Sequence, residues 1–370
     1  MVGARHLYVH LPFCASRCGY CDFVTVVGRA DTHGRYVDAL LRELELERPR
    51  LAPRLESVYL GGGTPTLTAP PAFERLLDAL PPAREVTVEA NPETVTSGLA
   101  SLLARKSVNR VSIGAQTFHM HLLDVLDRRA GPDDVRRSVH LLRDAGFDNI
   151  SLDLVYGIPG QEPAHVARDL EEALALEPEH LSAYELEAKP GTRFTHAHGA
   201  ELERQAETME SYFEQVVETL TASGYRWYET ASFCRRPGLA GGRDLRARHN
   251  LGYWLGRDYL GLGIGAVSTI ENRRLRNTPS LGRYLEALER RKPPPRDVEY
   301  LPTHVRVVER LMLGLRLDEP VPLGDVAGAV DEAELGRLVE AGLAASAGGS
   351  LTLTPRGRFL GGAVTARLLA

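Results

Sequence analysis

The chain has 370 residues, of which 43% are hydrophobic and 25% are charged, and its formal net charge is −5. These values are typical of an ordinary soluble globular protein, and the length predicts two domains. The weakly acidic balance argues against a protein that binds nucleic acid through a basic surface. Because no apolar run reaches the about 20 residues that span a bilayer, and no signal-peptide pattern is found, we expect a cytoplasmic protein without a transmembrane segment.

Short β-like runs alternate with longer helical patterns from residue 6 to about residue 230. The six β-like runs cover residues 7–10, 57–60, 85–90, 110–114, 149–155 and 180–184. Repeated strand-then-helix units give a parallel sheet whose right-handed crossovers curl it toward a barrel. Six units predict an α/β fold with a partial (β/α)6 barrel over residues 1–234, rather than a closed barrel of eight units.

The remaining residues interrupt this rhythm. We expect a loop-rich connecting region over residues 235–300 and a separate, smaller domain over residues 301–370. In the latter, helical patterns at 325–330 and 332–341 precede two β-like runs around Gly348-Gly349 within 343–354, which predicts a winged-helix-like domain. Since no basic recognition face is evident, we interpret this domain as one that contacts a protein or acts as a lid rather than one that binds DNA.

Three of the four cysteines are close together in the chain, at Cys14, Cys18 and Cys21. Three thiolates are one fewer than full protein ligation of a [4Fe–4S] cluster requires. The iron left open could chelate the amino and carboxylate groups of S-adenosylmethionine (SAM). A zinc site is the alternative, but it needs further ligands, and Cys234 has no neighbouring partner. A small number of cysteines, most of them clustered at the spacing of metal ligands, also fits a protein of a reducing compartment.

Polar or glycine-rich motifs follow several of the predicted strands. In parallel α/β folds, functional residues collect at this carboxyl-terminal edge of the sheet. The glycines of residues 61–66 would let the backbone approach a ligand closely, although a simple tight turn is the alternative. Glu89 could hydrogen-bond a ribose hydroxyl, Gln116 and Asp153 could contact adenosine or ribose, and Arg128 could neutralise a carboxylate. Each of these residues alone is more often an ordinary polar residue at a strand end.

Four segments together resemble the radical SAM family: residues 8–14 (YVHLPFC), 61–66 (GGGTPT), 113–118 (IGAQTF) and 153–160 (DLVYGIPG). They resemble in particular the branch that contains oxygen-independent coproporphyrinogen III oxidase and its relative, the bacterial heme chaperone. The resemblance implies a partial barrel and a [4Fe–4S] cluster bound by the three clustered cysteines. It also implies SAM contacts at Tyr8, Tyr20, Gly62, Gly63, Thr64, Glu89, Gln116, Arg128 and Asp153.

Three features separate the members of this branch. The oxidase is known for a fourth cysteine two residues after the third, where this chain has Phe23, and for an extension before the cluster motif, which here begins almost at the N-terminus. Residues 249–254 (HNLGYW) match the H-N-x-x-Y-W motif that the chaperone associates with heme. The resemblance therefore favours a carrier that binds heme and passes it to an acceptor protein, and no catalytic residue is assigned.

The alternative is a radical enzyme that oxidatively decarboxylates the propionates of coproporphyrinogen III, with a reductant protein as a further partner. The motifs expected to hold SAM support it, because a pure carrier has no obvious need of them. Two departures from the relatives weaken both oxidase chemistry and any particular heme ligation. Ala130 and Val267 occupy positions where many relatives have a histidine.

The heme-associated motif has a plausible chemistry of its own. His249 could ligate heme iron through a neutral imidazole, and Tyr253 and Trp254 offer flat apolar faces to a porphyrin. The alternative is that these aromatic side chains belong to the core and that hydrogen bonds satisfy His249. Arginines at 243, 246, 248, 273, 274 and 276 are hypothesised to hold heme propionates, unless they form a solvated basic loop.

Overall fold

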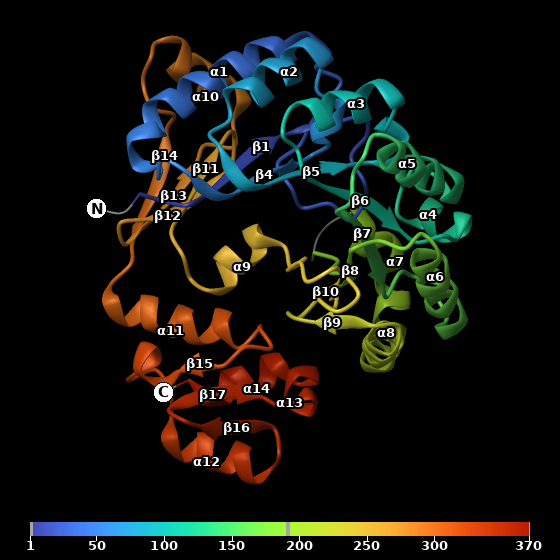
Figure 1. The fold of residues 1–370 in the computed structure, drawn as a ribbon, viewed down its shortest axis with the longest axis vertical. Helices are drawn as coiled ribbons and strands as arrows, with labels where there is room; N and C mark the ends of the chain where they lie inside the picture. The colour runs from blue at the N-terminus through green and yellow to red at the C-terminus, as the bar shows by residue number, and fades with distance from the viewer. Residues whose placement is uncertain (1–2, 190–192, 370) are drawn as a thin grey trace.

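The computed structural model describes residues 3–189 and 193–369, and its centre is a curved sheet of 12 strands (Figure 1). The strand order is β14-β13-β12-β11-β1-β4-β5-β6-β7-β8-β10-β9. Six of these strands run parallel in chain order: β1 (His6–Leu11), β4 (Leu55–Gly62), β5 (Ala83–Ala90), β6 (Arg110–Gln116), β7 (Ile150–Tyr156) and β8 (His180–Glu185). The predicted partial (β/α)6 barrel is therefore confirmed.

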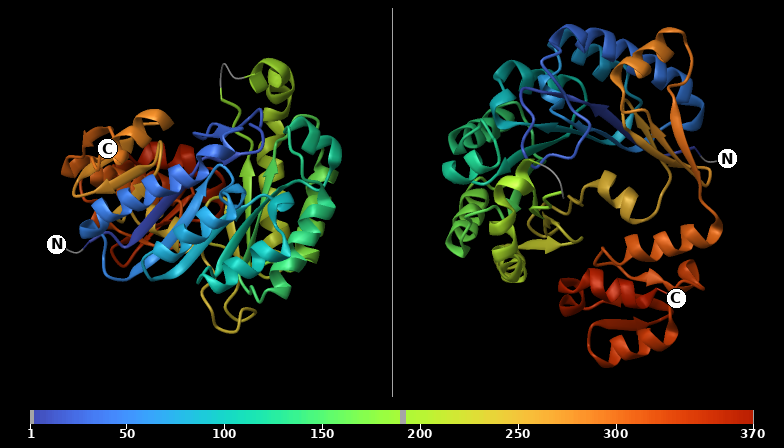
Figure 2. Two further views of the ribbon diagram at one scale, coloured as in Figure 1. Left: turned by 90° about the horizontal axis from the view of Figure 1, so that it is seen from above. Right: turned by 180° about the vertical axis from the view of Figure 1, so that it is seen from behind.

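The helices that follow these strands lie on the outer face of the sheet (Figure 2). They are α1 (His33–Glu47), α2 (Pro70–Ala79), α3 (Ser97–Arg105), α4 (Met120–Val125), α5 (Pro132–Asp144), α6 (Pro163–Ala175), α7 (Arg193–Gln205) and α8 (Met209–Ala222). Short 3-10 turns are η1 (Ala30–Thr32), η2 (Arg48–Arg50), η3 (Pro65–Leu67), η4 (Pro92–Thr94) and η5 (Ala206–Thr208). None of the described helices is both long and apolar enough to cross a membrane.

Alternation along each strand separates the core from the interior of the barrel. On β6, Val111, Ile113 and Ala115 are buried in the main apolar core, while Arg110 and Ser112 line an internal cavity. Strands β4 and β7 follow the same rule, with apolar residues in the core and polar residues inside. Successive side chains on a strand point to opposite faces, so a single strand serves both surfaces. The polar interior is what distinguishes this sheet from one buried by apolar layers on both sides.

Residues 225–300 extend the sheet at both edges. Beyond β8 come the antiparallel strands β10 (Ser232–Arg235) and β9 (Tyr225–Trp227). On the other side, β11 (Tyr259–Leu262) lies parallel to β1, and β12 (Val267–Ile270), β13 (Arg273–Asn277) and β14 (Arg296–Tyr300) follow in antiparallel order. Helix α10 (Leu281–Glu289) covers this part, and α9 (Arg248–Trp254) lies on the concave side of the sheet (Figure 1). The region predicted as a connection thus contributes strands to the barrel sheet, while the boundaries at 234 and 300 stay predictions.

The chain ends in a smaller unit with its own apolar core, which includes Leu311, Leu338 and Leu351. Its elements are α11 (Thr303–Gly314), β15 (Val321–Pro322), η6 (Leu323–Val326), α12 (Glu332–Glu340), β16 (Ala344–Ala347), β17 (Ser350–Leu353), α13 (Pro355–Phe359) and α14 (Gly361–Leu368). The wing is present, since β16 and β17 pair around Gly348-Gly349. The predicted helix at 325–330 was wrong: only a 3-10 turn ends there, because Gly328 takes a positive φ of 82° that no α-helix allows.

Candidate functional site

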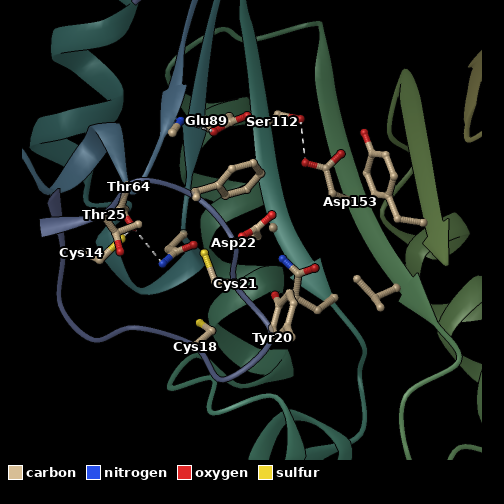
Figure 3. A pocket seen from close by; sticks show the side chains of 18 of the residues that line it. Cys14, Cys18, Tyr20, Cys21, Asp22, Thr25, Thr64, Glu89, Ser112 and Asp153 are labelled. Atoms are coloured by element: carbon tan, nitrogen blue, oxygen red, sulfur yellow. Dashed lines mark hydrogen bonds between the residues drawn. The ribbon is translucent and has the colours of Figure 1, made fainter. Parts of the chain in front are cut away.

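The three clustered cysteines lie on the loop between β1 and α1, where β2 (Phe13–Cys14) pairs with β3 (Val26–Val27) and closes the loop. Cys14, Cys18 and Cys21 are free and partly buried, and Figure 3 shows them at one end of a pocket. Burial, as the largest cause, raises the pKa of the Cys14 and Cys21 thiols. These thiols therefore gain from a bound cation that stabilises the thiolate form.

The donor set fits a cluster better than a single ion. Within residues 3–189 and 193–369, no three ligating side chains stand close enough together to hold one metal ion. The thiolates of a [4Fe–4S] site each bind a different iron atom, so they need wider spacing than the ligands of one zinc ion. The predicted cluster is compatible with three free, partly buried thiols on one loop.

A cavity of about 520 Å³ opens beside the cysteine loop. This volume is in the range of pockets that hold a small molecule or cofactor. The cavity brings together most of the residues predicted to bind the cluster or SAM: Cys14, Cys18, Tyr20, Cys21, Gly62, Gly63, Thr64, Glu89, Gln116, Arg128 and Asp153. Tyr8 is the exception, because its hydroxyl hydrogen-bonds His10 Nδ1 at 3.0 Å and its ring stacks on Tyr59 behind the cavity wall.

The glycine segment after β4 lies directly beneath the cysteine loop. Gly62 has a φ of 115°, and a Cβ at Gly63 would lie 2.6 Å from the backbone of Pro12. Only glycine fits both conditions, so these glycines are also required by the fold, whatever they bind. Thr64 Oγ1 lies 3.9 Å from Cys14 Sγ, which places the end of this segment against the predicted cluster.

Two carboxylates face the cavity, one from β5 and one from β7 on either side of β6, on the far side of the pocket from Cys18 in Figure 3. Glu89 accepts hydrogen bonds from the Tyr59 hydroxyl at 2.7 Å and from Gly62 N at 3.1 Å. Burial raises the pKa of Glu89 to about 7. Asp153 accepts from Ser112 Oγ at 3.0 Å, and burial raises its pKa as well, against the opposing charge of Arg110.

A β-bulge between Gly114 and Gln116 shapes the third wall of the cavity. Gln116 has a φ of 66°, a strained conformation for a residue with a side chain, of the kind that collects at functional sites. The Arg128 guanidinium crosses this bulge, donating to Gly114 O at 2.8 Å and to Asn91 Oδ1 at 3.0 Å. The bulge thus positions two predicted SAM contacts, Gln116 and Arg128, beside each other in the cavity lining.

The heme-associated motif lies on α9, and within it only Asn250 lines the cavity. His249 is 2% exposed, its Nδ1 is 3.0 Å from Ser57 Oγ, and its Nε2 is 3.1 Å from the Tyr253 hydroxyl. Burial lowers its pKa to about 3, so the imidazole is neutral. Trp254 packs under the guanidinium of Arg316 at 4.6 Å. The hydrogen bonds of His249 agree with the alternative given above, whereas Tyr253 and Trp254 are only half-buried. Heme ligation by His249 would require its hydrogen bonds to be exchanged.

Most of the arginines proposed to hold propionates already have acidic partners. Arg243 pairs with Asp148 at 2.7 Å, and Arg274 pairs with Glu299 at 3.0 Å. The other ion pairs of this set are Arg246 with Asp244 and Glu319, Arg248 with Glu56, Arg273 with Glu271, and Arg274 with Glu309. These arginines therefore serve the packing of loops and strands against one another in the structure.

Several residues that line the cavity were missed by the sequence analysis: Tyr59, Arg110, Ser112, Ser182, Tyr184 and Asn250. Most of them stand at alternate positions of the parallel strands, and β6 contributes Arg110, Ser112, Gly114 and Gln116 to the same wall. A period of two, counted back from each predicted strand-end residue, could have found them. Asn250 follows His249 in the heme-associated motif, and only the tertiary structure directs it to the cavity.

The fold and the three-cysteine loop define a member of a known class. Residues 8–173 match the Radical SAM superfamily and residues 301–360 match the HemN C-terminal domain. The structure resembles that of coproporphyrinogen III oxidase (HemN) from Escherichia coli, a radical SAM enzyme, with a TM-score of 0.81 and 22% identity. That likeness covers 99% of this chain and 90% of the oxidase and, at this identity, shows a shared fold.

Curated relatives narrow the class to one family. The chain is 34% identical to heme chaperone HemW of Mycobacterium tuberculosis (strain H37Rv), over 98% of this chain and 94% of the relative. It is 32% identical to heme chaperone HemW of Bacillus subtilis (strain 168), over 97% and 98% of the two chains. Heme chaperone HemW of Escherichia coli (strain K12) is 35% identical over 82% of each. The chain belongs to the HemW family of the radical SAM superfamily.

Proposed function

We propose that this protein is a heme chaperone, which binds heme and transfers it to an acceptor protein while carrying a [4Fe–4S] cluster and SAM. The observation that carries the proposal is the similarity to curated heme chaperones over almost the whole chain. Phe23 supports it: this side chain is 66% exposed and lines the cavity at the position where the oxidase is known for a fourth cysteine. The thiols need a reducing compartment, so the proposal includes a cytoplasmic location.

The cavity residues are assigned to the cofactors by their chemistry. Cys14, Cys18 and Cys21 would hold the cluster, which when bound supplies one-electron chemistry next to SAM. The backbone of Gly62, Gly63 and Thr64 would hold the methionine amine of SAM. The remaining contacts are proposed for Tyr20, Glu89, Gln116, Arg128 and Asp153, and for Tyr8, which does not itself line the cavity but stacks on the cavity residue Tyr59. A ribose hydroxyl would exchange hydrogen bonds with Glu89, and Arg128 would neutralise the carboxylate.

His249, Tyr253 and Trp254 remain the proposed heme contacts, with one condition that their burial imposes. Because both ring nitrogens of His249 are occupied, α9 must move before the imidazole can reach iron. Titration of the reconstituted wild type and His249→Ala with hemin tests this point by absorbance. Stoichiometric binding with an unchanged spectrum in the variant would exclude His249 as a ligand.

Transfer is tested on the same preparation. Heme-loaded protein is mixed with a heme-free globin as a stand-in acceptor, and the globin spectrum is followed. We expect transfer faster than the spontaneous loss of heme from serum albumin used as a control carrier. Failure of the wild type to bind hemin at all would overturn the chaperone proposal.

A second function is supported by the intact set of cavity residues, which a pure carrier does not obviously need. It is the oxidative decarboxylation of coproporphyrinogen III propionates, with a reductant protein as electron donor. The test is anaerobic incubation of the reconstituted protein with reductant, SAM and coproporphyrinogen III. Formation of protoporphyrinogen with release of carbon dioxide would establish this activity, and its absence would leave the carrier function alone.

A further inference from the structure

An arginine without a partner lies deep in the cavity. Arg110, the first residue of β6, is 2% exposed, and it lines the cavity. Across the described parts of the chain, its Nε has no hydrogen-bond partner and its guanidinium forms no ion pair within 4 Å. Burying a charge that lacks hydrogen bonds is strongly unfavourable, so a buried guanidinium in this state points to a ligand.

The carboxylates whose charges act most strongly on Arg110, Glu85 and Asp153, already accept hydrogen bonds from other donors. Glu85 accepts from the backbone N–H groups of Arg248 at 3.2 Å and His249 at 3.3 Å. Asp153 accepts from Ser112 Oγ at 3.0 Å. Burial alone would lower the pKa of Arg110, but the charge of Glu85 and other groups outweighs it and raises the pKa, so the guanidinium stays charged. The arginine thus keeps its charge while its hydrogen-bonding capacity is unused.

Arg110 lies at a different level of the cavity from Arg128, the arginine proposed to neutralise the SAM carboxylate, although its charge acts on Asp153, another proposed SAM contact. Arg128 contacts Gly114 O at 2.8 Å, four residues further along β6 than Arg110. At about 3.3 Å per residue, the two positions on the strand are roughly 13 Å apart. Arg110 and the point that Arg128 contacts therefore lie at different levels of β6, which favours separate anionic partners for the two arginines.

Asn250 supplies a second polar group to the same cavity from α9. The preceding residue anchors the helix: His249 is hydrogen-bonded to Ser57 on β4, and its backbone N–H donates to Glu85 on β5. This anchorage fixes the direction of the next side chain. Among the described residues, the carboxamide of Asn250 has no hydrogen-bond partner. Within the motif, His249 therefore anchors the helix, while Asn250 presents a free polar group to the cavity.

We propose that Arg110 and Asn250 form a carboxylate-binding subsite at the floor of the cavity. A guanidinium presents two parallel N–H groups that match the two oxygens of a carboxylate, and the carboxamide adds a third donor. The ligand group is a propionate of a tetrapyrrole, an assignment that rests on the proposed function, whereas the carboxylate chemistry rests on these two side chains alone.

Hemin and hemin dimethyl ester, in which both propionates are esterified, test the subsite with the reconstituted protein. We expect the wild type to bind hemin at least about tenfold more tightly than the ester, a difference of about 1.4 kcal/mol. Arg110→Gln and Asn250→Ala should each weaken hemin binding and leave binding of the ester unchanged. Arg75→Gln, which removes an exposed guanidinium paired with Asp38, is the matched control and should change neither affinity.

Equal affinity of the wild type for hemin and its ester would overturn the subsite, as would equal losses for both ligands in either variant. If Arg110→Gln does not fold, the ester comparison and Asn250→Ala decide the outcome. A second readout needs no heme: sodium propionate should raise the Tm of the wild type but not of Arg110→Gln. If propionate stabilises the wild type but hemin does not bind, the subsite is supported and the chaperone proposal is refuted. If hemin and its ester bind equally well, the chaperone proposal is supported and the subsite is refuted.

Discussion

Glu89 is the residue whose ionisation most directly links the cavity to stability. Its pKa is raised to about 7 by burial, above the value of 4.5 for an ordinary glutamate, so the folded protein binds a proton that the unfolded chain releases. Stability from this group is therefore greatest below about pH 4.5, falls as the pH rises toward 7, and stays lowered above it. The cavity without its cofactor holds a carboxylate that is poorly solvated at neutral pH.

Glu89→Gln should therefore stabilise the cofactor-free protein at pH 8 and have little effect at pH 5. We expect about 1–2 kcal/mol at pH 8, below the linkage limit because the side chain is only half-buried. Urea unfolding of wild type and variant at both pH values measures the difference. An equal effect at both pH values would show that the amide acts through packing or hydrogen bonding rather than through charge.

The three clustered cysteines and Cys234 give opposite expectations for iron binding. Cys14→Ser, Cys18→Ser and Cys21→Ser should each lower the iron content of the anaerobically reconstituted protein well below about four atoms per chain and bleach the visible absorbance. Cys234→Ala is the control, because Cys234 is buried in a small core beside Tyr228. Loss of iron in the control, or its retention in the three serine variants, would contradict the proposed cluster site.

At this scale the sequence predicted residues with a local signature and missed those that depend on the fold. The cysteines and Gly62 are recognisable from spacing alone, and the structure places them at one cavity. Arg110 begins its strand, at the opposite end from the edge where functional residues are expected, so the strand-end rule overlooks it. His249 was predicted as a heme contact because it begins the heme-associated motif, while its neighbour Asn250 is the one that lines the cavity.

Helix α9 is held in place chiefly by its histidine. His249 joins β4 through Ser57, contacts Tyr253 on its own helix, and stacks on the ring of Tyr59 at 4.9 Å. The helix has only seven residues, so its own backbone hydrogen bonds contribute little stability. These contacts give His249 a structural role whatever its part in heme binding.

His249→Ala should destabilise the heme-free protein by about 2–4 kcal/mol, since it opens a cavity and leaves Ser57 with one partner fewer. Ser57→Ala should cost about 1 kcal/mol. Urea unfolding of the heme-free wild type and of each variant measures both differences in stability. If His249→Ala retained full stability and lost only heme binding, the histidine would be a ligand held ready in α9 rather than its anchor.

At the scale of the whole molecule, the sheet is wider than the sequence indicated. The six parallel strands were predictable because apolar runs, glycine turns and helices recur in order. Strand β13 was not, because Arg273–Asn277 is rich in arginine and reads as a basic loop. Its stability comes from partners far along the chain, such as the pair of Arg274 with Glu299 on β14, and such pairing is decided by the folded structure rather than by local propensity.

A buried charge network connects this added part of the sheet to the first helix of the barrel. Glu43 on α1 is fully buried and accepts hydrogen bonds from Tyr284, Asn277 and Gly263 N, and its carboxylate lies 2.9 Å from Arg296 on β14. Burial raises the pKa of Glu43, and these donors oppose that shift. The network therefore makes α1, α10 and β13–β14 one packed unit.

Glu43→Ala should destabilise the protein by about 3–5 kcal/mol, because it leaves the Arg296 guanidinium short of one partner and three other donors unpaired in the interior. Glu289→Ala is the matched control: it also removes a glutamate paired with an arginine, Arg35, but on the surface, and should change stability by less than about 1 kcal/mol. Urea unfolding measures both. Similar small losses in the two variants would mean that β13–β14 are attached to the barrel by apolar packing, and that the buried charges contribute little to the union of the two parts.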